Sequence, residues 1–157
     1  MLEGPSQDVQ AFRRRQTRLV VSPLSHSNAV RSRAAHTPRL VPMRTLVTRE
    51  FTFEAAHSLP WHQGKCARLH GHSYRLVVTV EGPLDERGVV LDFADLSTLV
   101  ATHVLERFDH QHLNKFFDNP TAEIVANDIF VCLNNAGLAL TRVVLWETAN
   151  SYVTVEK

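Results

Sequence analysis

Alternating apolar and polar positions mark two strands in this sequence. From residue 44 to 56 most apolar side chains share one parity, and the histidine that follows keeps it: Val47, Phe51, Phe53, Ala55 and His57. The pattern returns up to residue 81, again in phase with histidines: His70, His72, Tyr74, Leu76, Val78 and Val80. Because alternate residues of a strand point to one face, the pattern predicts two half-buried strands joined by a loop around Pro60 and Gly64.

The middle of the chain has a helical period instead. Apolar residues recur every three or four positions behind Asp92, which is a typical N-cap, and form a stripe: Phe93, Leu96, Leu99 or Val100, and Val104. A second stripe follows with the same spacing: Val125, Ile129 and Leu133. We expect Asn119 to be the N-cap of this second helix, Pro120 its first residue and Gly137 the residue that ends it.

Two further alternating segments close the chain. Residues 140–148 and 151–156 predict a hairpin with Asn150 in its turn. The predicted order is therefore strand, strand, helix, helix, strand, strand, which is an α+β arrangement.

Composition narrows the class of protein. The chain has 157 residues, of which 44% are hydrophobic, and this is enough for one ordinary domain. A formal net charge of +1 gives no electrostatic reason to expect a nucleic-acid or membrane partner. Two cysteines make no disulfide framework, so we expect a reducing compartment, the cytoplasm. No apolar run approaches the roughly 20 residues of a membrane helix.

The N-terminal segment differs from the rest. Residues 1–43 carry seven arginines and four prolines without any apolar period, so we expect a disordered extension, with the domain in residues 44–157. An acid-poor, arginine- and serine-bearing leader resembles an organelle transit peptide. Alternatively, Met43 is the true start, which we favour because the strand pattern begins at Arg44. The run Arg13–Arg15 is a candidate nucleic-acid contact, although such a run more often belongs to a solvated tail.

Three histidines share the parity of the apolar ladders. His70 and His72 are two residues apart on one strand and therefore point to one face, while His57 ends the preceding strand. Imidazole is a good zinc ligand, and three protein ligands leave a fourth position for water or substrate, as in catalytic sites. A His-x-His pair is a weak signal by itself, because most strand histidines are only hydrogen-bonded. The shared parity strengthens it, and we predict a zinc site.

Cys66 lies four residues before His70. Its thiol has three candidate roles: a fourth zinc ligand, a catalytic thiolate, or an inert small hydrophobic group. Cys132 falls within the second predicted helix, where we expect inert packing.

Two polar features lie outside the histidine strands. Asp109 precedes His110, and a carboxylate there can orient an imidazole and raise its basicity, although such a pair is also common at helix ends. Glu147 interrupts an apolar strand. A buried carboxylate is costly unless paired, so Glu147 either faces outward or anchors a ring N–H system.

Taken in chain order, these motifs resemble the 6-pyruvoyltetrahydropterin synthase family. The motifs are Phe51–His57, Cys66 with His70-Gly71-His72, Asp109-His110-x-x-Leu113-Asn114, Asn119-Pro120-Thr121-x-Glu123, and Glu147-Thr148. The three-residue gap between Cys66 and His70 most resembles the 6-carboxytetrahydropterin synthase (QueD) branch of queuosine biosynthesis. The resemblance covers residues 44–157.

This resemblance implies the T-fold, a four-stranded antiparallel sheet with two helices on one face, in the order ββααββ. It implies zinc as the cofactor, held by His57, His70 and His72. It also implies association into homohexamers with active sites between subunits, which would cover exposed sheet edges.

The resemblance also implies roles for the polar residues. Cys66 as thiolate would take a proton from a side-chain carbon, and His110, oriented by Asp109, would move the second proton. Glu147 would accept hydrogen bonds from the pterin N–H groups. A smaller share of the pterin contact is implied for two further residues: Thr121 and Glu123.

The implied substrate is 7,8-dihydroneopterin triphosphate, converted to 6-carboxy-5,6,7,8-tetrahydropterin, acetaldehyde and triphosphate. Lys65 and Arg68 are the candidates for holding the triphosphate. The alternative activity is that of 6-pyruvoyltetrahydropterin synthase, which eliminates triphosphate without cutting the side chain. A third reading is a non-catalytic zinc module with Cys66 as the fourth ligand.

Overall fold

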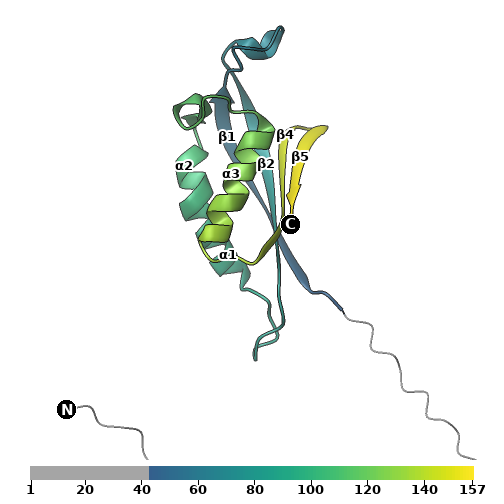
Figure 1. The fold of residues 1–157 in the computed structure, drawn as a ribbon. Coiled ribbons are helices and arrows are strands. Elements are labelled where there is room, and N and C mark those ends of the chain that lie inside the picture. The colour runs from purple at the N-terminus through teal and green to yellow at the C-terminus, as the bar shows by residue number, and fades with distance from the viewer. Residues whose placement is uncertain (1–42) are drawn as a thin grey trace, which may run out of the picture. The chain divides into compact units, whose positions relative to one another are not determined.

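The computed structural model describes residues 43–157, and Figure 1 shows their elements. The prediction that residues 1–43 form a disordered extension concerns residues outside this range, apart from Met43. None of the helices in the described range is long and apolar enough to cross a membrane.

Two strands form the centre of the sheet. β1 (Leu46–His57) and β2 (His70–Glu81) are antiparallel and paired along their whole length, so that His57 lies opposite His70. The predicted parity is confirmed, because the buried apolar residues and His57 alternate along both strands: Phe53, Ala55, His57, Tyr74, Leu76, Val78 and Val80. Thr79, on the other face of β2, is the exception and is also buried.

The rest of the sheet contains one strand that the pattern did not predict. β4 (Leu140–Thr148) and β5 (Ser151–Glu156) form the expected hairpin, and β4 pairs with β2. A short β3 (Gln111–His112) pairs in parallel with β1, giving the order β3-β1-β2-β4-β5. The predicted four-stranded antiparallel sheet therefore has a fifth, parallel strand. Two residues are too few to show an alternation.

The first predicted helix is present with an irregular middle. It consists of α1 (Phe93–Val100), a π-helical turn η2 (Ala101–Leu105) and α2 (Glu106–Phe108) in succession. Asp92 caps it as predicted, because its carboxylate accepts from the Ala94 N–H at 2.7 Å. Leu96, Val100 and Val104 are fully buried, whereas Phe93 lies at the edge of the stripe and is 56% exposed.

The second predicted helix begins later than expected. α3 spans Ala122–Asn135 and its N-cap is Thr121, whose hydroxyl accepts from the Ile124 N–H. The prediction that Asn119 caps and Pro120 opens this helix was wrong. Tertiary contacts hold both outside it, because the Pro120 carbonyl bonds to His57 and the Asn119 side chain bonds to Trp61. The end was predicted correctly, since Gly137 has a positive φ of 95°.

Thr121 provides a stability prediction. Thr121→Ala removes the capping hydroxyl and should lower the free energy of unfolding by about 1 kcal/mol, measured by urea denaturation. Thr121→Ser keeps the hydroxyl and should stay close to the parent. Equal stability of the alanine variant and the parent would show that the cap contributes nothing.

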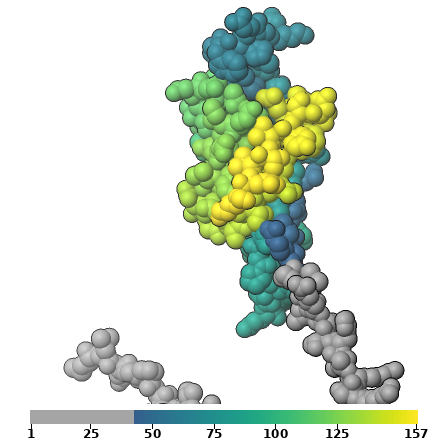
Figure 2. Space-filling model, turned by 45° about the vertical axis from the view of Figure 1, so that its right-hand side comes forward, coloured from purple at the N-terminus to yellow at the C-terminus, as the bar shows by residue number. Residues whose placement is uncertain are grey.

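α1, α2 and α3 cover one face of the sheet (Figure 1). α3 packs on β4 and β5, and α1 and α2 pack on β1, with one continuous apolar core between the layers. The loop between β1 and β2 projects beyond the end of the sheet (Figure 2). The three histidines therefore lie at the base of this loop, where the core meets the surface.

Candidate metal centre and active site

The β1–β2 pairing brings the three predicted histidines together. His57 is opposite His70, and His72 is opposite Ala55, with all three side chains on the helix-covered face. One ring nitrogen from each histidine lies within 4.8 Å of the others. His57 Nε2 and His70 Nε2 are 3.1 Å apart. The strand parity and the register are therefore sufficient to build the cluster.

Backbone carbonyls set the tautomers of two of these rings. His57 Nδ1 donates to the Pro120 carbonyl at 2.7 Å, and His70 Nδ1 donates to the Arg68 carbonyl at 2.8 Å. A carbonyl only accepts, so in the neutral rings each Nε2 is left with a lone pair. This is the outer-shell arrangement that orients metal-bound histidines in proteins.

The cluster has the chemistry of a cation site. Two Nε2 lone pairs at 3.1 Å repel each other unless a proton or a metal cation lies between them. His72 Nε2 is buried and has no hydrogen-bond partner within residues 43–157. A divalent metal would satisfy all three nitrogens together, so the residues present fit such an ion.

Burial keeps the third histidine in its ligand form. Desolvation lowers the pKa of His72 below its ordinary value of 6.5, and the neighbouring His57 and His70 act in the same direction. The Glu147 carboxylate opposes this shift. A lowered pKa means that His72 is neutral near pH 7, as a metal ligand must be.

An aromatic pair lies beneath the histidines. Tyr74 stacks on Phe53 with ring centroids 5.0 Å apart, and its edge contacts His72 at 5.6 Å between centroids. Tyr74 is fully buried, and burial, assisted by Glu147, raises the pKa of its hydroxyl above the ordinary value. The side of the cluster that faces the core is therefore shielded from water, and charge interactions there are stronger than in water.

Glu147 connects the histidines with an adjacent pocket. Its Oε1 lies 3.5 Å from His57 Nε2 and 3.9 Å from His72 Nε2, and its side chain is 27% exposed. The same residue lines a pocket of about 350 Å³. The prediction left open whether Glu147 faces outward or anchors a ring N–H system, and the structure places it in the wall of this pocket.

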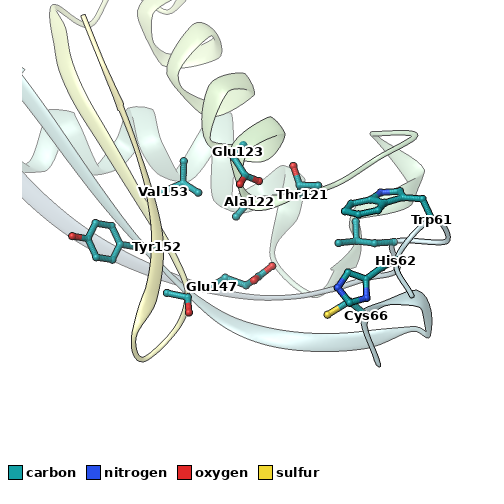
Figure 3. A pocket seen from close by; sticks show the side chains of 11 residues that line it. Trp61, His62, Cys66, Thr121, Ala122, Glu123, Glu147, Tyr152 and Val153 are labelled. Carbon is teal, nitrogen blue, oxygen red and sulfur yellow. The ribbon is translucent and has the colours of Figure 1, made fainter. Parts of the chain in front are cut away.

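Figure 3 shows how this pocket is built. Thr121 and Glu123 approach from the start of α3, opposite Glu147 of β4, and Cys66 enters from the loop between the histidine strands. Four predicted site residues therefore share one pocket. Its other lining residues are Leu59, Trp61, His62, Ala122, Ser151, Tyr152 and Val153. The triphosphate candidates Lys65 and Arg68 are exposed and do not line it.

Sequence reasoning missed the aromatic residues of this wall. Trp61 is 62% exposed, yet its indole N–H donates to Asn119 Oδ1 at 2.7 Å, which ties the projecting loop to the segment before α3. Tyr152 comes from β5. Trp61 could have been predicted as a site residue, because it lies in the loop between the two strands that carry the predicted ligands. Nothing in the local sequence pattern distinguished Tyr152.

Neither Asp109 nor His110 lines the pocket of Cys66. Asp109 Oδ1 accepts from the Glu54 N–H at 2.9 Å and lies 2.9 Å from His110 Nδ1, while the His110 N–H donates to the Glu54 carbonyl at 2.6 Å. His110 lines a second pocket of about 530 Å³ with Glu54, Ser73, His112 and Lys115 among its walls. The predicted pair is formed, but the subunit does not bring it into the pocket of Cys66.

The backbone at His110 is strained. Its φ is +57°, a left-handed value that few residues other than glycine adopt, and its side chain is 77% exposed. Such strain is kept where the surroundings enforce it, often at functional sites. Here the two bonds to Glu54 and the bond to Asp109 hold it.

The pKa of Asp109 gives a pH prediction. The Glu54 N–H, more than His110, holds this pKa below its ordinary value of 3.8, against a smaller effect of burial. A depressed carboxyl pKa stabilises the fold above the unfolded value, and the contribution is lost as pH falls through the folded value. Asp109→Asn should therefore be less stable than the parent at neutral pH, and the difference should vanish in strong acid.

Urea midpoints measured from about pH 7 to about pH 2 would check this. Asp118→Asn, at an exposed carboxylate in the loop before α3, is the matched control. A difference between Asp109→Asn and the parent that persists unchanged at the lowest pH would contradict the charge-based explanation.

The fold and the three-histidine cluster define the class of this protein as an α+β domain with a candidate metal site. Comparisons with known proteins identify its family. The family model described as 6-pyruvoyl tetrahydropterin synthase matches residues 46–157. The solved structure of Caenorhabditis elegans 6-pyruvoyl tetrahydropterin synthase is similar with a TM-score of 0.66 and 29% identity, covering 73% of this chain and 96% of that one. The chain belongs to the 6-pyruvoyl tetrahydropterin synthase family, as its motifs predicted.

Sequence relatives carry the names of two different activities. The chain is 41% identical over 114 residues to the 6-carboxy-5,6,7,8-tetrahydropterin synthase of Synechocystis sp., covering 68% of this chain and 88% of the relative. It is 37% identical over 106 residues to a putative enzyme of the same name from Archaeoglobus fulgidus, covering 68% and 90%. It is also 35% identical over 108 residues to the dihydroneopterin monophosphate aldolase of Pyrococcus furiosus, covering 67% and 91%.

Proposed function

We propose that this protein is a zinc-dependent 6-carboxytetrahydropterin synthase. It converts 7,8-dihydroneopterin triphosphate and water to 6-carboxy-5,6,7,8-tetrahydropterin, acetaldehyde and triphosphate, the reaction of queuosine biosynthesis. The observation that carries the proposal is the convergence of three histidine nitrogens beside a pocket containing Cys66 and Glu147. The name shared by several relatives supports this branch.

The metal site contributes one part of the chemistry. His57, His70 and His72 hold zinc, which supplies Lewis acidity to the hydroxyl oxygens of the substrate side chain. The carbonyls of Pro120 and Arg68 keep the first two rings in the binding tautomer.

The other residues bind the substrate and move protons. Glu147 accepts hydrogen bonds from the pterin N–H groups, and a site built this way rejects rings that lack them. Thr121 and Glu123 complete the pocket wall on the opposite side. Cys66, as a thiolate, takes a proton from a side-chain carbon.

The second proton transfer of the reaction is assigned to His110, which lines a different pocket from Cys66. Within one subunit, neither Asp109 nor His110 lines the pocket of Cys66, so in this proposal they serve the site of a neighbouring subunit. β5 and β3 are the two edges of the described sheet, and pairing between copies would cover them. A homohexamer with intersubunit sites is the assembly we propose.

Product analysis tests the function. Purified zinc-loaded protein is incubated with 7,8-dihydroneopterin triphosphate, and the pterins are identified by mass spectrometry together with an assay for acetaldehyde. Carboxytetrahydropterin with acetaldehyde supports the proposal. A 6-pyruvoyl product without acetaldehyde would assign the alternative activity, which the C. elegans similarity favours. Cleavage only of dihydroneopterin monophosphate would assign the aldolase reaction, and no turnover would leave a binding module.

A further inference from the structure

Asn114 forms a two-way bridge to the residue that follows His57. Its Oδ1 accepts from the Ser58 N–H at 2.9 Å, and its Nδ2 donates to the Ser58 carbonyl at 3.0 Å. One side-chain amide therefore satisfies both backbone groups of Ser58. The bridge extends the parallel pairing of β3 with β1, in which Ala55 and Ala56 lie opposite Gln111 and His112.

The segment that carries Asn114 is also fastened at its other end. Asp109 Oδ1 and the His110 N–H bond to the two backbone groups of Glu54. Residues 109–114 are thus clamped along residues 54–58, the end of β1 that carries His57. The motif Asp-His-x-x-Leu-Asn therefore has a structural meaning, since its first two residues and its last residue hold the same strand end.

The bridge also lies between His57 and the loop of Cys66. After Ser58, the next backbone contact is Leu59 N–H donating to the Cys66 carbonyl at 2.8 Å. Without Asn114, both backbone groups of Ser58 would lose a partner, and the strand end would fray more readily. Fraying there moves His57, which is only 1% exposed and has its ring fixed by the Pro120 carbonyl.

We propose that Asn114 is a positioning residue that keeps His57 in its metal-binding position and couples the metal site to the Asp109–His110 pair. It touches neither the metal nor the substrate. The coupling is reciprocal: metal bound to His57 stabilises the end of β1, and through the bridge it orders residues 109–114. The inference rests on the proposed function, because it requires the three histidines to bind zinc.

Zinc affinity and hydrogen exchange test the bridge. In the full chain, zinc dissociation constants are measured by competition with a chromophoric chelator for the parent, Asn114→Ala and Asn114→Asp. The alanine variant should bind zinc about tenfold more weakly, at the lower end of the effect of losing a direct hydrogen-bond partner of a ligand, because Asn114 acts on His57 through the backbone of Ser58. The aspartate variant keeps the acceptor and loses the donor, so its affinity should fall between the other two.

The second readout separates coupling from general stability. Zinc should raise the hydrogen-exchange protection of residues 109–114 in the parent, and this gain should be absent in Asn114→Ala. Asn134→Ala is the matched control, because Asn134 also uses its side chain, accepting from Lys157 Nζ at 3.0 Å at the end of α3. It should retain both the affinity and the protection gain.

Parent-like zinc affinity in Asn114→Ala, or a loss no larger than in Asn134→Ala, would overturn the inference while leaving the proposed function intact. If the alanine variant does not fold, parent-like affinity and protection in Asn114→Asp would overturn it equally. Failure of the parent chain to bind zinc would overturn the proposed function and the coupling together.

Discussion

His72→Ala should abolish stoichiometric zinc binding and, with it, product formation. Two histidines remain, and the variant lacks the ligand whose Nε2 has no other partner in residues 43–157. For the same reason, no protein hydrogen bond to this nitrogen is lost, and the metal-free variant should keep the fold. Elemental analysis after dialysis gives the stoichiometry, and thermal denaturation with and without zinc gives the stability.

The effect of zinc on the melting temperature should distinguish the parent from His72→Ala. Zinc binds only the folded cluster, so it should raise the melting temperature of the parent and leave that of His72→Ala unchanged. His103→Ala, in the π-helical turn η2, is the histidine control and should respond like the parent. Full zinc content in His72→Ala would mean that other ligands hold the metal.

Cys66→Ala should lose turnover but keep zinc. If the thiolate takes the substrate proton, its removal should reduce the rate by about 10²–10⁴-fold, the usual contribution of a positioned acid or base. Zinc stoichiometry should remain one per chain, because the three histidines suffice. Single-turnover measurement of carboxytetrahydropterin, together with metal analysis of the same sample, checks both parts.

Cys132→Ala is the matched control for this experiment. Cys132 lies in α3, with its sulfur 3.8 Å from the His103 carbonyl, outside the pocket of Cys66. It should keep full activity. Loss of zinc and of the folded state in Cys66→Ala would instead identify Cys66 as the fourth ligand of a structural site.

Much of the sheet was predictable because strand parity is a local property. The alternation of apolar residues in β1 and in β2 is visible within each short segment of the sequence, and the histidines of both segments have the same parity as the apolar residues. The start of α3 was predicted wrongly for the opposite reason. Asn119 and Pro120 have the local preferences of a helix start, but contacts to Trp61 and His57, 58 and 63 residues away, keep them outside the helix.

By itself, then, the sequence determined which faces of β1 and β2 are buried, that three histidines belong to the buried face, and which family the chain resembles. Only the tertiary structure decided that the histidine nitrogens converge, because this depends on the register that sets His57 against His70. It also separated the Asp109–His110 pair from Cys66 and joined Asn114 to Ser58. The contacts of Asp109 with Glu54 and of Asn114 with Ser58 link residues 55 and 56 positions apart, and such distances in the chain leave no periodic pattern along it.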